Sequence, residues 1–162
     1  MSEPRWHVLK WFGLSFACLV VDQVTKFIII DRLSLYEHVP VFAHFNLVLT
    51  YNPGAAFSFL GDAGGWQRWL FIGIALIVSM IAIVWLLKLP SRGVPWLSTG
   101  LSLMLGGALG NLWDRVQLGQ VVDFLSVYYG QWAWPAFNVA DICICIGAAC
   151  FIISIVKKEE NM

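Results

Sequence analysis

The chain has 162 residues, of which 59% are hydrophobic and only 12% are charged. Soluble domains carry about a quarter charged residues, and a soluble protein of this size has too little interior to bury so many apolar side chains. Ten basic and ten acidic residues give a formal net charge of zero, which gives no indication of a nucleic-acid partner. The composition therefore predicts an integral membrane protein with a single domain, residues 1–162.

Four segments have the length and apolar character of transmembrane helices, which need about 20 residues to cross the hydrocarbon core. They cover approximately residues 8–30, 69–87, 96–115 and 137–156. The first could be mistaken for a signal peptide, but its length and the presence of Asp22 and Lys26 favour a retained helix. We therefore predict a mainly α-helical membrane protein with four transmembrane helices.

The distribution of lysine and arginine predicts the orientation in the membrane, because cytoplasmic loops carry an excess of both. Six of the ten basic residues fall on the side that holds both termini: Arg5, Lys10, Lys88, Arg92, Lys157 and Lys158. Both termini are therefore predicted to be cytoplasmic.

Two longer sections are predicted on the outer side. In the first, between the first two helices, alternating apolar residues over 44–51 and the turn signal Asn52-Pro53-Gly54 predict a small extracytoplasmic β element. The second section, residues 117–136, holds Asp123 and an aromatic cluster that we expect to lie among the lipid headgroups: Tyr128, Tyr129, Trp132 and Trp134.

Polar residues from four separate segments converge near the outer membrane face. Asp22 and Lys26 lie in the outer half of the first helix and, being four residues apart, share a face and are expected to pair. A charge within the membrane costs a few kcal/mol and usually marks a functional site. Snorkelling of long side chains to the interface explains one or two of these residues and not the whole set. The remaining members are Asn111, Asp114 and Arg115 on the third helix, Asp123 between helices, and Asn138 and Asp141 on the fourth.

The chemistry available at this depth is that of carboxylates. The sequence has no HExxH zinc motif, no GxxxxGK loop and no serine with a histidine at the same depth, so neither a metal nor a cofactor is predicted. Two carboxyl groups in a partly dry site share a proton, so one can activate water while the other donates a proton. Asp123 and Asp141 are the predicted pair, because one short connection separates them.

Three alternatives compete with this interpretation. A transporter or proton channel requires polar residues through the full depth of the bilayer, whereas the inner halves of these helices are nearly bare of them. A presenilin-like protease requires a GxGD motif, which is absent. A structural scaffold is disfavoured by the clustering of costly aspartates and asparagines.

Five sequence blocks together resemble bacterial lipoprotein signal peptidase, also called signal peptidase II. Each block alone is weak, but all five occur in the family's order and the resemblance covers nearly the whole chain. They read DQVTK at 22–26, NPGAAF at 52–57, GGALGNLWDR at 106–115, VVDF at 121–124 and FNVAD at 137–141.

The resemblance implies an aspartic endopeptidase that cuts prolipoproteins just before a cysteine already carrying a diacylglyceryl group. Asp123 and Asp141 match the catalytic dyad, Asp22 and Lys26 match a supporting block, and Asp114 is expected to hold Arg115 by a charge-assisted hydrogen bond. The partners implied are prolipoprotein substrates and membrane lipid, and we expect a monomer. The positions that match substrate-binding residues are Asn52, Gly54, Gly107, Asn111, Arg115, Asn138 and Ala140.

The same resemblance implies a multi-pass protein of the bacterial cytoplasmic (inner) membrane, with its active site near the outer face. Within the third block, Gly106 and Gly110 form a small-xxx-small pattern that lets helix backbones approach closely. Two positions depart from the family pattern: Ile142-Cys143 follows Asp141, where a small polar residue such as serine is expected next to the aspartate, and Trp113 replaces a smaller aliphatic residue.

Overall fold

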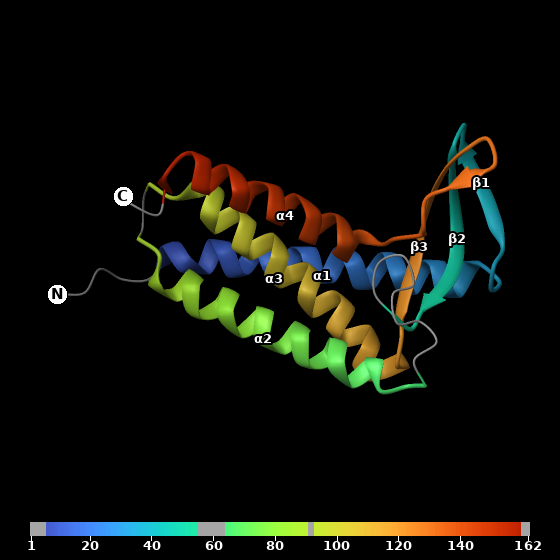
Figure 1. The fold of residues 1–162 in the computed structure, drawn as a ribbon, viewed down its shortest axis with the longest axis horizontal. Helices are drawn as coiled ribbons and strands as arrows, with labels where there is room; N and C mark the ends of the chain where they lie inside the picture. The colour runs from blue at the N-terminus through green and yellow to red at the C-terminus, as the bar shows by residue number, and fades with distance from the viewer. Residues whose placement is uncertain (1–5, 55–63, 91–92, 160–162) are drawn as a thin grey trace.

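The computed structural model describes residues 6–54, 64–90 and 93–159. Four helices run side by side, and a small sheet covers one end of the bundle (Figure 1). In chain order the elements are α1 (Trp6–Arg32), β1 (His38–Phe42), β2 (Phe45–Asn52), α2 (Gln67–Lys88), α3 (Pro95–Leu118), β3 (Val121–Tyr129), β4 (Trp132–Ala133) and α4 (Val139–Val156).

The helix boundaries differ from the predicted ones by at most three residues, and the caps explain the differences at the end of α3 and the start of α4. The third helix continues to Leu118 because Gly119, with φ of 80°, provides the left-handed residue that ends it. The fourth helix begins at Val139 instead of residue 137, because Asn138 forms a capping box with Asp141.

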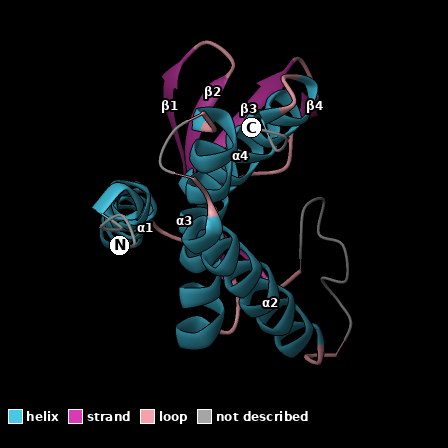
Figure 2. Cartoon of the chain, turned by 90° about the vertical axis from the view of Figure 1, so that its left-hand side faces the viewer, coloured by secondary structure: helices cyan, strands magenta, loops and turns pink. Residues whose placement is uncertain are grey.

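The central helix is α3, which packs against α1, α2 and α4 (Figure 2). Its small residues make this possible. A Cβ added to Gly106 would lie 2.6 Å from the Ser15 carbonyl oxygen of α1, and one added to Gly100 would lie 2.8 Å from the Gly147 carbonyl oxygen of α4. The small-xxx-small prediction is therefore confirmed, since the α1 backbone at Ser15 lies against Gly106 and the Asp22 side chain of α1 lies against Gly110.

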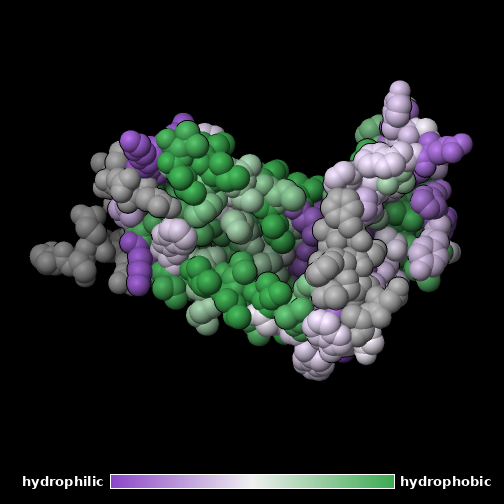
Figure 3. All heavy atoms as spheres, viewed as in Figure 1, coloured by the Kyte–Doolittle hydropathy of each residue, from purple (hydrophilic) through white to green (hydrophobic). Residues whose placement is uncertain are grey.

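The bundle surface is apolar over most of its length (Figure 3). Large side chains such as Ile77 and Met80 of α2, each 62% exposed, point outward where lipid would cover them. Among the described residues, three helices are long and apolar enough to cross a membrane: α1, α2 and α4. The central helix α3 is not among these three, so the predicted fourth span stays a prediction.

The sheet has four antiparallel strands in the order β1-β2-β3-β4. The predicted β element between the first two helices is confirmed as β1 and β2, but its extent was wrong. The second outer section supplies β3 and β4, and Thr50 of β2 pairs with Asp123 of β3. Aromatic residues are common in strands as well as at the headgroup level of the membrane. The aromatic cluster was interpreted only as a headgroup anchor, so the strands in this section were not predicted.

The sheet is joined to α1 by a buried apolar cluster of Ile29, Leu49, Val122 and Phe124. Val122 and Phe124 are both directed into this cluster, and successive side chains of a strand point to opposite faces. Asp123, which lies between them, is therefore directed to the other face of β3, toward the pocket lined by the start of α4.

Candidate active site

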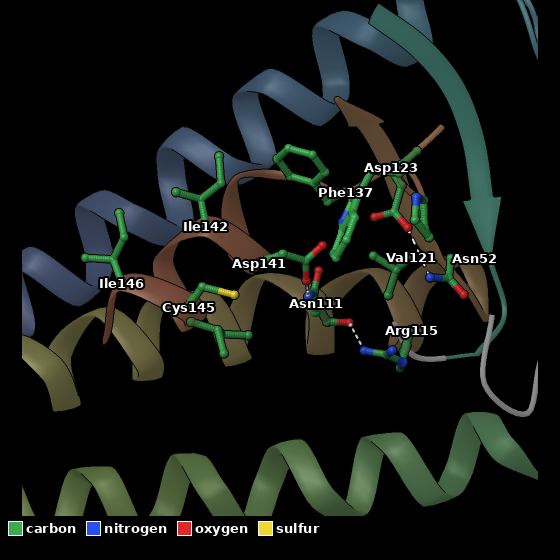
Figure 4. A pocket seen from close by; sticks show the side chains of 14 residues that line it. Asn52, Asn111, Arg115, Val121, Asp123, Phe137, Asp141, Ile142, Cys145 and Ile146 are labelled. Carbon is green, nitrogen blue, oxygen red and sulfur yellow. Dashed lines mark hydrogen bonds between the residues drawn. The ribbon is translucent and has the colours of Figure 1, made fainter. Parts of the chain in front are cut away.

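A pocket of about 550 Å³ lies where the sheet meets α3 and α4 (Figure 4). Asp123 of β3 and Asp141 of α4 both line it, so the structure brings together the two carboxyl groups that the sequence pairs. Asn52, Asn111 and Arg115 line the same wall. The polar end of the pocket is thus built from two strands and two helices.

Asn138 connects the two aspartates. Its Nδ2 donates to Asp123 Oδ1 at 2.7 Å, and its Oδ1 accepts from the backbone N–H of Asp141 at 2.9 Å. Asp141 Oδ2 in turn accepts from the backbone N–H of Asn138 at 3.2 Å, which completes the capping box at the start of α4. Because Asn138 is fully buried, it fixes the position of one carboxyl group relative to the other.

Two further amides complete the hydrogen bonds of the carboxyl groups. Asn111 Nδ2 donates to Asp141 Oδ1 at 2.9 Å, and Asn52 Nδ2 donates to Asp123 Oδ2 at 3.1 Å. All four oxygens of the two aspartates therefore accept a hydrogen bond from an uncharged N–H group. Such bonds hold the carboxyl groups in place without neutralising them by a direct ion pair.

Burial is the main influence on Asp123, which is only 3% exposed. Loss of water and, after it, repulsion from Asp141 raise the pKa of Asp123 to about 7, against the hydrogen bonds from Asn52 and Asn138. The group therefore exchanges its proton near neutral pH, which is the property required of a general acid or base.

Behind the pocket lies a buried ionic cluster. Lys26 Nζ is 2.8 Å from Asp22 Oδ2 and 2.8 Å from Asp114 Oδ2, so the predicted pairing of Asp22 with Lys26 is confirmed. Asp114 also accepts from the backbone N–H of Val122 at 3.1 Å, which ties α3 to β3. The expectation that Asp114 holds Arg115 is wrong, because Asp114 is directed to Lys26 instead.

Arg115 is directed to backbone carbonyl groups. Its Nη2 donates to the Gly54 carbonyl oxygen at 2.9 Å, and its guanidinium lies 5.0 Å from the ring centroid of Phe71. Arg115 thereby joins α3 to the turn that follows β2 and lines the pocket beside Asp123.

Gly107 and Ala140 are close-packing residues of the α3–α4 contact. A Cβ on Gly107 would clash with the Ala140 carbonyl oxygen, and the Ala140 side chain is fully buried. The backbone N–H of Ala140 donates to Asp22 Oδ1 at 2.8 Å, which links α1 to the first turn of α4. These two residues therefore set how closely Asp141 approaches Asn111.

Two residues of this region were not predicted from the sequence. Gln23 Nε2 donates to Asp114 Oδ1 at 2.9 Å and to Asp22 Oδ2 at 3.1 Å, and its polar side chain within the first helix was an available signal. Arg68 donates from Nε to the Arg115 carbonyl oxygen at 2.9 Å, and nothing in its sequence surroundings indicates this contact.

The far side of the pocket is apolar. Ile142, Cys145 and Ile146 continue from Asp141 along α4 (Figure 4), and the segment from Trp134 to Phe137 also lines the pocket. The pocket therefore combines a polar end suited to a peptide group with an apolar face that extends along a lipid-facing helix (Figures 3 and 4).

Comparison with known proteins agrees with this arrangement. The model of the family Signal peptidase (SPase) II matches residues 14–157. The chain belongs to the signal peptidase II family. It is 48% identical to the lipoprotein signal peptidase of Pseudoalteromonas atlantica over 158 residues, 98% of this chain and 96% of that protein. It is also 48% identical to the lipoprotein signal peptidase of Pseudomonas syringae pv. tomato, over 99% of this chain and 94% of that protein.

Two solved structures described as bacterial membrane enzymes share the fold of this signal peptidase II family member. One superposes with a TM-score of 0.82 at 29% identity, over 94% of this chain and 90% of that chain. The other gives a TM-score of 0.78 at 30% identity, over 91% and 93% of the two chains. The chain is thus a membrane protein of a bacterial peptidase family.

Of the two departures from the family pattern, Trp113 lies away from the carboxyl groups, whereas Ile142 follows Asp141 directly and lines the pocket. Trp113 is 56% exposed on the outer surface of α3 and does not line the pocket. Cys143 is buried on α4 beside Cys18 of α1. Neither departure removes a hydrogen-bond donor of Asp141, because these donors are Asn111 Nδ2 and the backbone N–H of Asn138.

Proposed function

We propose that the chain is an aspartic endopeptidase that removes signal peptides from diacylglyceryl-modified prolipoproteins, cutting before the lipidated cysteine. The observation that carries the proposal is the pair Asp123 and Asp141, joined by Asn138 in a pocket with an apolar side. Membership in the signal peptidase II family supports the same reaction.

In the proposed mechanism, one ionised carboxylate takes a proton from water while the water oxygen forms a bond to the scissile carbonyl carbon. The second carboxyl group, which is protonated, donates its proton to the carbonyl oxygen. When the resulting diol collapses, the C–N bond breaks and the leaving amine takes the proton that the first carboxylate gained. The second carboxylate recovers its proton from a diol hydroxyl group, so the pair returns to its starting state.

The pocket offers separate surfaces for the two parts of such a substrate. The Asn52 amide and the Arg115 guanidinium provide donors for peptide carbonyl groups next to Asp123. Ile142, Cys145 and Ile146 provide an apolar surface for acyl chains or for the apolar part of the signal peptide. The proposed partners are thus a lipidated prolipoprotein and the surrounding membrane lipid.

We further propose that all four helices span the cytoplasmic membrane of a bacterium as a monomer, with both termini in the cytoplasm. The 24 residues of α3 give about 36 Å at ~1.5 Å per residue, and α3 packs against all three other helices. This packing supports a spanning α3, since its buried polar residues Asn111 and Asp114 contact protein instead of lipid. The pocket then lies near the outer face, where a lipidated cysteine has its acyl chains.

The test is cleavage of a diacylglyceryl-modified prolipoprotein in detergent by the wild type, Asp123→Asn and Asp141→Asn. Both variants are expected to lose at least about a thousandfold in kcat while retaining the wild-type melting temperature within a few degrees. An unmodified precursor is the matched control and is expected to resist cleavage. Near-normal turnover by either folded variant would rule out the two-carboxylate mechanism.

A further inference from the structure

The ammonium group of Lys26 is held in one place by three acceptors. Its Nζ lies 2.8 Å from Asp22 Oδ2, 2.8 Å from Asp114 Oδ2 and 3.1 Å from Asn111 Oδ1. An ammonium group has three N–H donors, so each of them has a partner. The side chain is only 2% exposed, and its two bonds to carboxylates are charge-assisted. The position of the positive charge is therefore fixed relative to the pocket.

This fixed charge determines which way the Asn111 amide points. Asn111 Oδ1 accepts from Lys26 and from Asn138 Nδ2 at 3.2 Å, and neither group can act as an acceptor there. A flipped amide would place the NH₂ group of Asn111 against both donors. Asn111 is thus held with Nδ2 directed at Asp141 Oδ1, 2.9 Å away.

Asp141 accordingly receives N–H groups at both oxygens. Oδ1 accepts from Asn111, and Oδ2 accepts from the backbone N–H of Asn138. Asp141 is also the third residue of α4, where unpaired N–H groups and the helix dipole favour a negative charge. Both oxygens of Asp141 therefore face N–H donors, and neither donor can accept a proton from the carboxyl group.

Asp123 has a different environment. It lies on β3, not within a helix, and accepts from the side-chain amides of Asn52 and Asn138. It is 3% exposed and faces the charge of Asp141, so both desolvation and repulsion favour its protonated form.

Building on the two-carboxylate function proposed above, we propose that Lys26 is a positioning residue that acts through Asn111, making Asp141 the ionised base and Asp123 the proton carrier. Asp141 then takes the proton from water, and Asp123 donates its proton to the carbonyl oxygen. The roles of two chemically identical side chains are thereby set by the amide orientation that Lys26 imposes.

Several charged groups lie around Asp141 and influence whether its carboxyl group is ionised. From α3 these are Arg115, which lines the pocket, and Asp114, whose charge is paired with Lys26. From β3 it is Asp123, and from α1 the paired Asp22 and Lys26 lie behind Asn111, which donates to Asp141. Removal of Lys26 alone would leave the charges of Asp22 and Asp114 unpaired, so the test must keep the net charge of this cluster.

The first experiment uses the double variant Lys26→Met with Asp22→Asn, which removes one positive and one negative charge. Asn at position 22 still has an oxygen for the Ala140 N–H group. The measurement is the pH profile of kcat and KM on the lipidated precursor, with Lys88→Met near the opposite end of the bundle as the matched control. We expect the acidic limb to move upward, so that kcat at pH 5 falls about tenfold while KM stays within about twofold. An unchanged profile, or a change confined to KM, would refute the positioning role.

The second experiment identifies the proton carrier without relying on the Lys26 variant. Infrared spectra of detergent-solubilised wild type at pH 6, with ¹³C-labelled aspartate, report protonated carboxyl groups. The protonated band is expected to disappear in Asp123→Asn and to remain in Asp141→Asn. The opposite result, or any other pattern, would overturn the assignment. Inactivity of both asparagine variants would still support the two-carboxylate peptidase, so the two proposals fail separately.

Discussion

The contact between Gly107 of α3 and Ala140 of α4 predicts a strong effect of adding one methyl group. In Gly107→Ala, the new Cβ would lie within van der Waals overlap of the Ala140 carbonyl oxygen and 2.8 Å from Ile144 Cγ1. Because carbon atoms pack at about 3.5–4.0 Å, the first turn of α4 must move by about 1 Å. Asp141 follows Ala140 directly, so its 2.9 Å bond to Asn111 would be lost.

A displacement of about 1 Å at a reacting group can reduce turnover by about a hundredfold. Overpacking of a buried contact typically costs about 1–3 kcal/mol of stability, so the variant should still fold in detergent. Gly107→Ala is therefore expected to lose far more kcat than stability. The assay measures cleavage of the lipidated precursor together with thermal unfolding in the same detergent.

Two glycines provide the matched controls, because a Cβ added to Gly13 of α1 or Gly73 of α2 meets no atom within 4 Å. Alanine is favoured over glycine within a helix by about 1 kcal/mol, so Gly13→Ala and Gly73→Ala should be neutral or slightly stabilising, with full activity. Wild-type turnover in Gly107→Ala would refute the reasoning. So would an equal loss in all three variants.

The remaining predictions concern proton binding and the two ends of α3. Burial raises the pKa of Asp123 from 3.8 to about 7, so between these values the folded state binds more protons than the unfolded state and stability falls as pH rises. Asp123→Asn should therefore flatten the fall in melting temperature between pH 4 and about 7, and an unchanged slope would contradict this. Arg68→Ala removes a bond to the Arg115 carbonyl oxygen and should cost about 1–2 kcal/mol together with some activity, measured by unfolding and cleavage. Glu159→Ala should cost about 1 kcal/mol with unchanged kcat, because Glu159 caps the Leu97 N–H group at the opposite end of α3.

Much of the fold and of the candidate site could be predicted from local sequence features. The apolar lengths located the helices within a few residues, and the depth of the polar residues located the pocket. The pairing of Asp22 with Lys26 followed from their spacing of four along one helix. Each of these features depends on residues close together in the chain.

The parts that could not be predicted depend on contacts between distant segments. The pairing of β3 with β2 joins Asp123 to Thr50, and nothing in either strand alone specifies its partner. Asp114 was expected to hold the adjacent Arg115, but tertiary packing directs it to Lys26 of another helix. Arg68 reaches the end of α3 from the start of α2, a contact set by how the two helices pack.

The arrangement of charges around the two aspartates has a consequence for their chemistry. Within the described residues, no salt bridge reaches Asp123 or Asp141, whose oxygens instead accept from Asn52, Asn111 and Asn138. A direct ion pair with lysine or arginine would stabilise both carboxylates in the ionised form and would remove the acid that the reaction needs. Neutral amides orient the carboxyl groups and still allow one of them to hold a proton near neutral pH. The Asn111 amide lies between the Lys26 ammonium group and Asp141. The charge of Lys26 therefore influences which aspartate is ionised, but it does not form an ion pair that would prevent proton exchange.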